Sequence, residues 1–217
     1  FYGKFAMIPT LEPASQQEAY DMMEEAFQLS EEQHLPVLVR VTTRMAHSRA
    51  VVKVKETPRQ QNELNYNAQA SNWVLLPAFA RKRNAIVTAQ QAELETIAEK
   101  SSHNKYEDAA DHSMGIIATG IAYNYLMECF PDGCPFPVLK ISHYPLPKAL
   151  VRRMTEACES VLIAEEGQPF VEEMVRGVMP GNTVIKGRLT GELPRTGELN
   201  PDLIKKALSI ESDERYA

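Results

Sequence analysis

The sequence predicts an α/β protein with a doubly wound, mainly parallel sheet. From about residue 111 onward, short apolar runs alternate with helical patterns at regular spacing. In the first half, a helical pattern and then an apolar run between residues 14 and 41 form one more α–β step. Strands and helices that alternate in this way connect through right-handed crossovers and form a parallel sheet.

The first half predicts a helix and then a buried strand. Gln16 to Ser30 carries apolar or small residues at helical spacing, and Ser15 before it is a possible N-cap. Leu35 to Val41 is almost continuously apolar, as a strand covered on both faces of a sheet would be. Val51 to Lys55 alternates and predicts a short strand with one wet face. Residues 14–41 therefore form an α–β step.

Residues 56–110 predict a linker that contains a helix. The stretch ETPRQQNELNYNAQASN is polar and lacks clear periodicity, so it predicts a linker or a long excursion. A brief apolar patch follows at Trp73 to Ala80, and the stretch from Arg81 to Ser101 is rich in Ala, Gln, Glu and Lys. Those residue types favour a helix, with Ile86, Leu94 and similar residues available as its apolar face.

The second half predicts a complete small α/β domain. Its apolar runs and helical patterns alternate four times, with strands expected at residues 114–119, 136–141, 160–164 and 183–186 and helices at 121–129, 148–158, 169–176 and 201–208.

Composition limits the partners. The 217 residues are 44% hydrophobic and carry a net charge of −6, which argues against a general nucleic-acid surface. The longest apolar runs fall far short of the roughly 20 residues that a membrane span needs. The three cysteines include no Cys-x-x-Cys pair, which fits a reducing, cytoplasmic setting. We therefore expect small molecules or proteins as partners, and neither nucleic acid nor a membrane.

Three predicted strand ends in the second half carry polar residues. Thr119 and Gly120 could meet an anion at the start of the next helix, but a structural turn is favoured because no Gly-rich phosphate loop is present. His143 could contact a ligand, and a packed or surface imidazole is favoured over that role. Glu165 and Glu166 could act as an acid/base pair, whereas a hydrogen bond to the next helix or a contact across an interface is the favoured use.

The stretch RVTTRMAHSR directly follows the apolar run that ends the first half's predicted strand. An Arg at such a position presents a planar fork that binds a carboxylate or phosphate with two hydrogen bonds. Thr42 and Thr43 could orient that ligand or simply cap the turn. An Arg here could equally pair with one of the 29 acidic residues of the chain. The residues alone therefore leave an anion site and an internal ion pair open.

Six stretches of the chain together resemble the large (alpha) subunit of indolepyruvate:ferredoxin oxidoreductase, in the order found in that family. They are LPVLVRVTTRMAHSRAVV, NWVLLPAFARKR, MGIIATGIAYNYLME, PVLKISHYPLPKALV, VLIAEEGQPFVEEMV and KGRLTGELPRTGELNPDLI. Among them, TTRMAHSR and GELPRTGELNPD are the most specific motifs. The chain starts at Phe1 without a Met, and we expect a piece of a longer polypeptide.

The resemblance implies a thiamine-diphosphate enzyme that oxidatively decarboxylates aryl-pyruvates such as indolepyruvate to acyl-coenzyme A and passes electrons to ferredoxin. It implies thiamine diphosphate, Mg²⁺ and [4Fe-4S] clusters in the full enzyme, and a beta subunit, ferredoxin, a 2-oxo acid and coenzyme A as partners. Because the family's diphosphate motif, pyrimidine-activating Glu and cluster cysteines have no match here, this piece alone is expected to hold no cofactor and to be inactive.

The resemblance also implies a division of the chain. Residues 1–55 would be the end of a thiamine-pyrimidine-binding α/β domain, residues 56–110 a linker with a helix, and residues 111–217 a domain similar to the transketolase C-terminal domain. The last of these would pack against the other domains of its own subunit and against the second subunit.

By the same resemblance, Arg44 matches an arginine that faces the substrate carboxylate, and Thr43 and His47 would line the same mouth. The family more often has Ser-His-Ser-Arg-Gly where this chain has Ala46 to Ala50, which suggests a somewhat different turn. Two alternatives remain: a 2-oxoacid:ferredoxin oxidoreductase for branched-chain or aliphatic substrates, and a non-catalytic α/β domain for subunit interaction.

Overall fold

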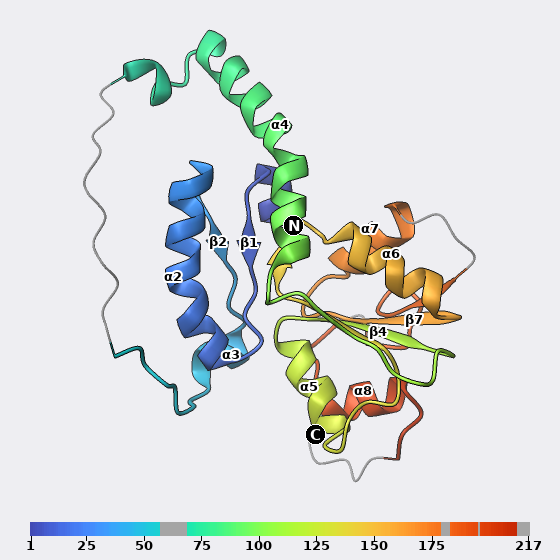
Figure 1. The fold of residues 1–217 in the computed structure, drawn as a ribbon. Helices are drawn as coiled ribbons and strands as arrows, with labels where there is room; N and C mark the ends of the chain where they lie inside the picture. Colours follow the sequence, from blue (N-terminus) through green and yellow to red (C-terminus); the bar gives the residue numbers. More distant parts are fainter. Residues whose placement is uncertain (57–68, 179–182, 195, 212–217) are drawn as a thin grey trace.

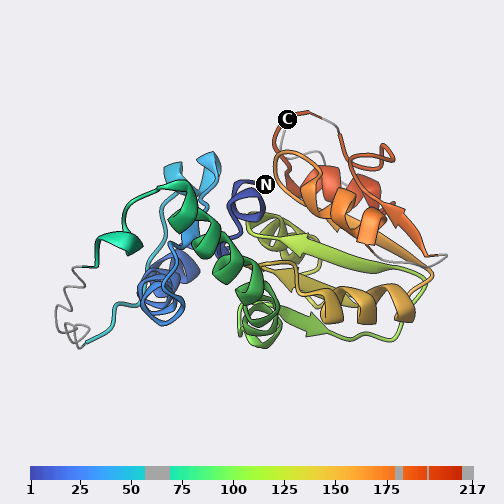
Figure 2. The same ribbon diagram turned by 90° about the horizontal axis from the view of Figure 1, so that it is seen from above.

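The computed structural model describes residues 1–56, 69–178, 183–194 and 196–211, and it contains two sheets (Figure 1). The larger sheet has five strands in the order β3-β5-β4-β7-β8, and the smaller has three in the order β2-β1-β6. In Figure 2 the regions that hold the two sheets lie side by side. The α/β class and the mainly parallel sheet predicted from the sequence are confirmed.

The five-stranded sheet is parallel except at one edge. Its central strand β4 (Gly115–Thr119) lies between β5 (Val138–Ile141) and β7 (Ser160–Ala164), and β8 (Val184–Lys186) follows β7, all in parallel. The other edge, β3 (Lys105–Glu107), is antiparallel to β5. Strand β3 was not predicted, because its three residues KYE show no apolar pattern.

Helices cover both faces of this sheet (Figure 1). The helices α5 (Ile121–Cys129) and α8 (Pro201–Ala207) lie on one face, and α6 (Lys148–Ala157) and α7 (Phe170–Val178) lie on the other. Right-handed crossovers require this arrangement, since α5 leads from β4 to β5 whereas α6 and α7 lead in the opposite direction. The sheet is thus doubly wound, as predicted, with a separate apolar core on each face.

The three-stranded sheet combines both halves of the chain. Its central strand β1 (Thr10–Leu11) pairs in parallel with β2 (Leu38–Val39) and antiparallel with β6 (His143–Tyr144). The short helix α1 (Tyr2–Ala6) precedes β1, and α2 (Gln16–Gln33) connects β1 to β2. The Ser15 side chain accepts a hydrogen bond from the backbone N–H of Glu18, which confirms the predicted N-cap.

The predicted strand from Leu35 to Val41 is wrong in length and in burial. Only its central two residues pair as β2, and Leu38 remains 37% exposed. The reason is that β2 lies at the edge of its sheet in the described residues, and α2 packs against Leu11 and Val39 from one face. A strand with one open side and one open face does not need to be buried throughout.

Residues 51–55 do not form the predicted strand, and this segment is irregular. Side chains of α2 hold its backbone instead: Gln17 Oε1 accepts from Lys53 N at 2.8 Å, and Tyr20 Oη accepts from Lys55 N at 3.1 Å. The predicted polar excursion that follows lies mostly outside the described residues. After it come a 3₁₀ turn (Ala70–Asn72) and the long helix α4 (Pro77–Lys100), which confirms the predicted helix.

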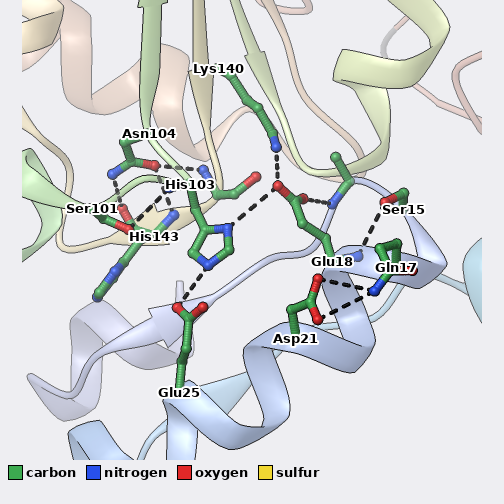
Figure 3. A network of polar contacts seen from close by, with 12 residues as sticks. Ser15, Gln17, Glu18, Asp21, Glu25, Ser101, His103, Asn104, Lys140 and His143 are labelled. Carbon is green, nitrogen blue, oxygen red and sulfur yellow. Dashed lines mark hydrogen bonds and ion pairs between the residues drawn. The ribbon is translucent and has the colours of Figure 1, made fainter. Parts of the chain in front are cut away.

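The helix α4 runs from the first region, which holds the three-stranded sheet, to the second region, which holds the five-stranded sheet. A polar network at the C-terminal end of α4 joins the two regions (Figure 3). His103 contacts two carboxylates of α2, Glu18 Oε1 at 3.5 Å and Glu25 Oε2 at 2.7 Å. Lys140 of β5 forms an ion pair with the same Glu18. Asn104 Oδ1 accepts from the backbone N–H groups of Ser142 and His143.

In the described residues no helix is both long enough and apolar enough to cross a membrane.

Candidate functional site

Ligands in doubly wound sheets bind outside the carboxyl ends of the strands where the chain reverses direction across the sheet. In this protein the reversal occurs at β4, because the chain passes first to β5 and then back past β4 to β7. The carboxyl ends of β4 and β7 carry Thr119-Gly120 and Glu165-Glu166, two of the pairs singled out from the sequence. Strands β1 and β2 contribute Glu12 and Arg40 to the same region.

Gly120 forms the turn into α5 and is packed against Glu12. Its φ of 47° lies in the left-handed region, and a Cβ atom there would lie 2.6 Å from Cγ of Glu12. The interpretation of Thr119-Gly120 as a structural turn is therefore confirmed.

The buried carboxylate of Glu12 is satisfied within the protein. It forms an ion pair with Arg40, and its Oε2 accepts from Tyr144 Oη at 3.1 Å. Burial raises the pKa of Glu12, against the effect of Arg40. Arg40 also donates from Nη2 to the carbonyl of Glu166 at 3.2 Å, and so connects the end of β2 to the end of β7.

Glu165 and Glu166 stabilise two different segments and do not act on each other as an acid/base pair would. Both oxygens of Glu165 accept backbone hydrogen bonds at the start of α7, from Val171 N at 2.8 Å and Glu172 N at 3.0 Å. Burial nevertheless raises the pKa of Glu165 to about 7. Glu166 Oε1 accepts from Leu199 N at 3.0 Å. The favoured prediction, a hydrogen bond to the next helix, is confirmed for Glu165, whereas Glu166 binds the backbone of Leu199 in the distant loop instead.

His143 is a packed imidazole, as the sequence analysis preferred. The residue is 6% exposed, and burial, together with the neighbouring His103, lowers the pKa of His143 to about 4.

Arg188 fixes the loop that contains the GELPRTGELNPD motif. This arginine is 3% exposed. Its Nε donates to the Glu165 carbonyl at 3.1 Å, and its Nη1 donates to the Pro194 carbonyl at 2.6 Å. The Nη2 group reaches the Gly197 carbonyl at 3.4 Å and lies 3.9 Å from Glu166 Oε2. One buried guanidinium thus ties several turns of the loop to the end of β7.

The RVTTRMAHSR motif forms the short helix α3 (Thr43–His47). Thr42 caps it, since its Oγ1 accepts from Met45 N at 3.4 Å, and this is one of the two uses predicted for the threonines. Met45 is 5% exposed and packs into the core beside Ile121 and Leu199. This anchor fixes the face of α3 and leaves Thr43, Arg44 and His47 exposed.

Arg44 is the point where the two most specific motifs meet. Its Nη2 donates to Glu198 Oε2 at 2.8 Å, and its guanidinium lies 6.0 Å from the centre of the Tyr125 ring. The hydrogen bond to Glu198 raises the pKa of Arg44, and burial raises the pKa of Tyr125 to about 12. Two outcomes were left open for Arg44, an internal ion pair and an anion site. The structure shows an internal ion pair with Glu198. Because the partner is a carboxylate, the geometry is also compatible with an anion site.

A cavity of about 530 Å³ opens beside this region. Its polar lining includes Glu12, Arg40 and Glu165, and its apolar lining includes Leu38 and Phe170. The two carboxylates are already hydrogen-bonded within the protein. None of Thr43, Arg44 and His47 is among the described residues that line the cavity, so the predicted substrate residues lie on α3 outside it.

Within the described residues, no group of three or more His, Cys, Asp and Glu side chains is arranged to hold a metal ion. Cys129 and Cys158 are buried in the cores on opposite faces of the five-stranded sheet, and Cys134 is half-buried. This donor set does not fit Mg²⁺ or an iron–sulfur cluster, so we assign no cofactor-binding residue here.

Glu198, Arg188 and Glu12 were not predicted as parts of this region. The motif GELPRTGELNPD was recognised as specific, but nothing in it indicates which residue it contacts. Glu12 could have been found, because it follows β1 just as Arg40 follows β2, and both are polar residues at strand ends.

No protein-family model matches the chain. Individual relatives do match. The indolepyruvate oxidoreductase subunit IorA of Methanothermobacter thermautotrophicus is 35% identical over 214 residues, which are 96% of this chain and 35% of the relative. The same subunit of Archaeoglobus fulgidus is 34% identical over 223 residues, and that of Pyrococcus horikoshii is 32% identical over 237 residues. The chain spans about a third of the length of these curated relatives.

The fold is similar to part of a solved structure, the 2-oxoglutarate:ferredoxin oxidoreductase from Magnetococcus marinus with 2-oxoglutarate, coenzyme A and succinyl-CoA bound. The TM-score is 0.60 with 13% sequence identity, over 93% of this chain and 41% of that chain. The sequence matches show that the chain is homologous, over nearly its whole length, to about a third of the indolepyruvate oxidoreductase subunit IorA.

Proposed function

We propose that the chain is part of the alpha subunit of a cytoplasmic, thiamine-diphosphate-dependent oxidoreductase that converts aryl-pyruvates such as indolepyruvate to acyl-coenzyme A. Ferredoxin would accept the electrons, and a beta subunit would complete the enzyme. The support is the homology to IorA, whose name specifies indolepyruvate, and the likeness of the fold to a structure with coenzyme A bound. In the full enzyme thiamine diphosphate, Mg²⁺ and [4Fe-4S] clusters would be held by residues outside this chain.

Within that enzyme, Arg44 would bind the carboxylate of the 2-oxo acid, with Thr43 and His47 beside it. The observation that carries this role is the hydrogen bond of 2.8 Å between Arg44 and the Glu198 carboxylate. A carboxylate therefore fits against this guanidinium, and the side chain of Arg44 is 45% exposed. Because α3 is capped by Thr42 and anchored by Met45, the backbone that carries Arg44 is fixed where an incoming anion can reach its guanidinium.

Holding the carboxylate would fix the adjacent 2-oxo carbon for attack. Positioning of this kind can contribute several kcal/mol to a reaction barrier. Arginine suits the task because its planar fork can make two parallel hydrogen bonds to one carboxylate.

The test is the replacement of Arg44 in the complete two-subunit enzyme. Arg44→Ala should lower kcat/KM for indolepyruvate about 100-fold, since hydrogen bonds to charged groups contribute about 1.5–3 kcal/mol. Arg44→Lys should recover part of this loss, because the charge remains and the fork is lost. The control is Arg152→Ala, at an exposed arginine on α6.

Steady-state kinetics with a panel of aryl, branched-chain and aliphatic 2-oxo acids would provide the measurement. Kinetics of Arg44→Ala that match the parent enzyme would refute the carboxylate role. A preference for aliphatic substrates across the panel would instead assign the enzyme to another substrate class and leave Arg44 in its role.

A further inference from the structure

Glu198 occupies the position at Arg44 that a substrate carboxylate would need. Its Oε2 lies 2.8 Å from Arg44 Nη2, and the two side chains are 52% and 45% exposed. Ion pairs with this much exposure are weak, because water screens the charges and both side chains lose rotamer freedom. A second carboxylate that arrives from solvent can therefore compete for the same guanidinium.

The backbone on both sides of Glu198 is fixed. The Gly197 carbonyl, just before it, accepts from Arg188 Nη2 at 3.4 Å, and the Leu199 N–H, just after it, donates to Glu166 Oε1 at 3.0 Å. Leu199 is fully buried in the core. The loop therefore does not need to move for Arg44 to be released, because a rotation of the Glu198 side chain is sufficient. After that rotation the carboxylate still remains within a side chain's length of Arg44.

We propose that Glu198 determines substrate specificity by competing for Arg44 and by repelling additional negative charge. This inference rests on the proposed role of Arg44. A 2-oxo acid with one carboxylate replaces Glu198 at the guanidinium and tolerates the displaced charge nearby. A 2-oxo acid with a second carboxylate carries twice the negative charge, so the displaced Glu198 carboxylate repels it more strongly. The fixed loop keeps Glu198 close enough for this difference to matter.

Other charges around the pair do not cancel this effect. Glu166 also acts electrostatically on Arg44, but Arg188 lies 3.9 Å from Glu166 Oε2 and offsets its negative charge. Tyr125 is neutral near pH 7, since burial raises its pKa to about 12. The surroundings therefore favour a ligand with a single negative charge, in agreement with a neutral aryl side chain on the 2-oxo acid.

The test is Glu198→Gln in the complete enzyme, with KM measured for indolepyruvate and for 2-oxoglutarate. We expect KM to fall about three-fold for the monocarboxylate and about ten-fold for the dicarboxylate, because the repulsion scales with ligand charge. Both changes should shrink as the ionic strength rises, since the charges are exposed. Glu198→Asp, which keeps the charge, should retain the discrimination between the two substrates.

The matched control is Glu173→Gln, which changes the net charge equally at an exposed position of α7. It should leave the ratio of the two KM values unchanged. An unchanged KM ratio in Glu198→Gln would overturn the proposal, and so would a raised KM for indolepyruvate, which would mean that Glu198 orients Arg44 for the substrate.

The outcome for Arg44→Ala distinguishes the carboxylate-binding role of Arg44 from the specificity role of Glu198. If Arg44→Ala weakens indolepyruvate turnover and Glu198→Gln has no effect, the specificity role fails and the carboxylate role stands. If Arg44→Ala leaves kcat/KM for indolepyruvate unchanged, the proposed function of Arg44 fails, and the specificity role fails with it.

Discussion

The two regions of the molecule bury their apolar residues to very different extents. The central strand β4 and its neighbours β5 and β7 are almost fully buried, whereas Leu38 in β2 is 37% exposed. All but two of the large apolar side chains that are exposed in the described residues lie before residue 90, the exceptions being Val184 and Leu189.

The difference teaches how the two regions are stabilised. The five-stranded sheet has helices on both faces and two cores of its own. The three-stranded sheet has a small core formed by Leu11, Met22 and Ala26 with two partly buried valines. Its stability therefore depends more on the network at the junction.

The comparison is tested most strongly by one substitution made in both regions. Leu139→Ala in β5 should lower the free energy of unfolding by about 4 kcal/mol, because the side chain is fully buried and leaves a cavity. Leu38→Ala in β2 should cost about 1 kcal/mol or less, because part of that side chain already contacts water. Urea unfolding followed by circular dichroism measures both values. Equal costs would mean that the two sheets are packed to the same degree.

A second, smaller effect concerns the loop that Arg188 fixes to the end of β7. Arg188→Ala should cost about 3 kcal/mol, since it removes a buried cation and leaves the carbonyls of Glu165, Pro194 and Gly197 without their donor. Arg152→Ala, at an exposed arginine, should change the unfolding free energy by less than about 0.5 kcal/mol. A cost for Arg188→Ala that is as small as that of the control would show that the loop does not depend on this residue.

The smallest effect concerns the junction between the regions and depends on pH. Burial would raise the pKa of Glu18, yet hydrogen bonds from His103, Lys140 and the Ala14 N–H lower it to about 2. The folded pKa is below the ordinary value of 4.5, so this stabilisation is present above pH 4.5 and is lost as the pH falls toward 2. Glu18→Gln should flatten this acid-side loss, and Glu31→Gln, at an exposed residue of α2, should not.

On the alkaline side the same junction depends on His103. The hydrogen bond to Glu18 raises the pKa of His103 above its ordinary 6.5, and the contact with Glu25 adds to this effect. The stabilisation is then complete below pH 6.5 and is lost as the pH rises through the folded pKa. Thermal unfolding between pH 2 and 9 would measure both limbs. A profile that is identical in Glu18→Gln and the parent protein would contradict the assignment of the network as the junction's main electrostatic contact.

Local patterns were sufficient to predict most of the second region. The bounds of α5 and β7 agree with the prediction, because each is a short segment with a clear apolar pattern between turn residues. Ser15 was identified as an N-cap for a similar local reason. The prediction failed for β2 and β3, where the outcome depends on which strands and helices lie alongside. Burial of a strand is a property of its neighbours, which the strand's own residues do not encode.

The candidate site was predicted only in part, because some of its contacts join residues that are far apart along the chain. The sequence indicated that Arg44 would meet either an anion or an internal acid, since its position after a strand is a local feature. It did not indicate Glu198, which lies 154 residues away along the chain. The hydrogen bonds of Glu165 to the start of α7 were predicted, because that helix directly follows the residue. The partner of Glu166, Leu199, was not predicted, because it follows from the path of the loop that Arg188 fixes.

The pairing of β6 with β1 has a practical consequence for dissecting the protein. The small sheet takes one of its edge strands, His143–Tyr144, from the distant part of the chain. A polypeptide that ended before residue 143 would leave β1 with unpaired N–H and C=O groups along one side, and such open edges recruit other chains and aggregate. Expression of the first region alone should therefore give insoluble material unless a strand equivalent to β6 is supplied in trans.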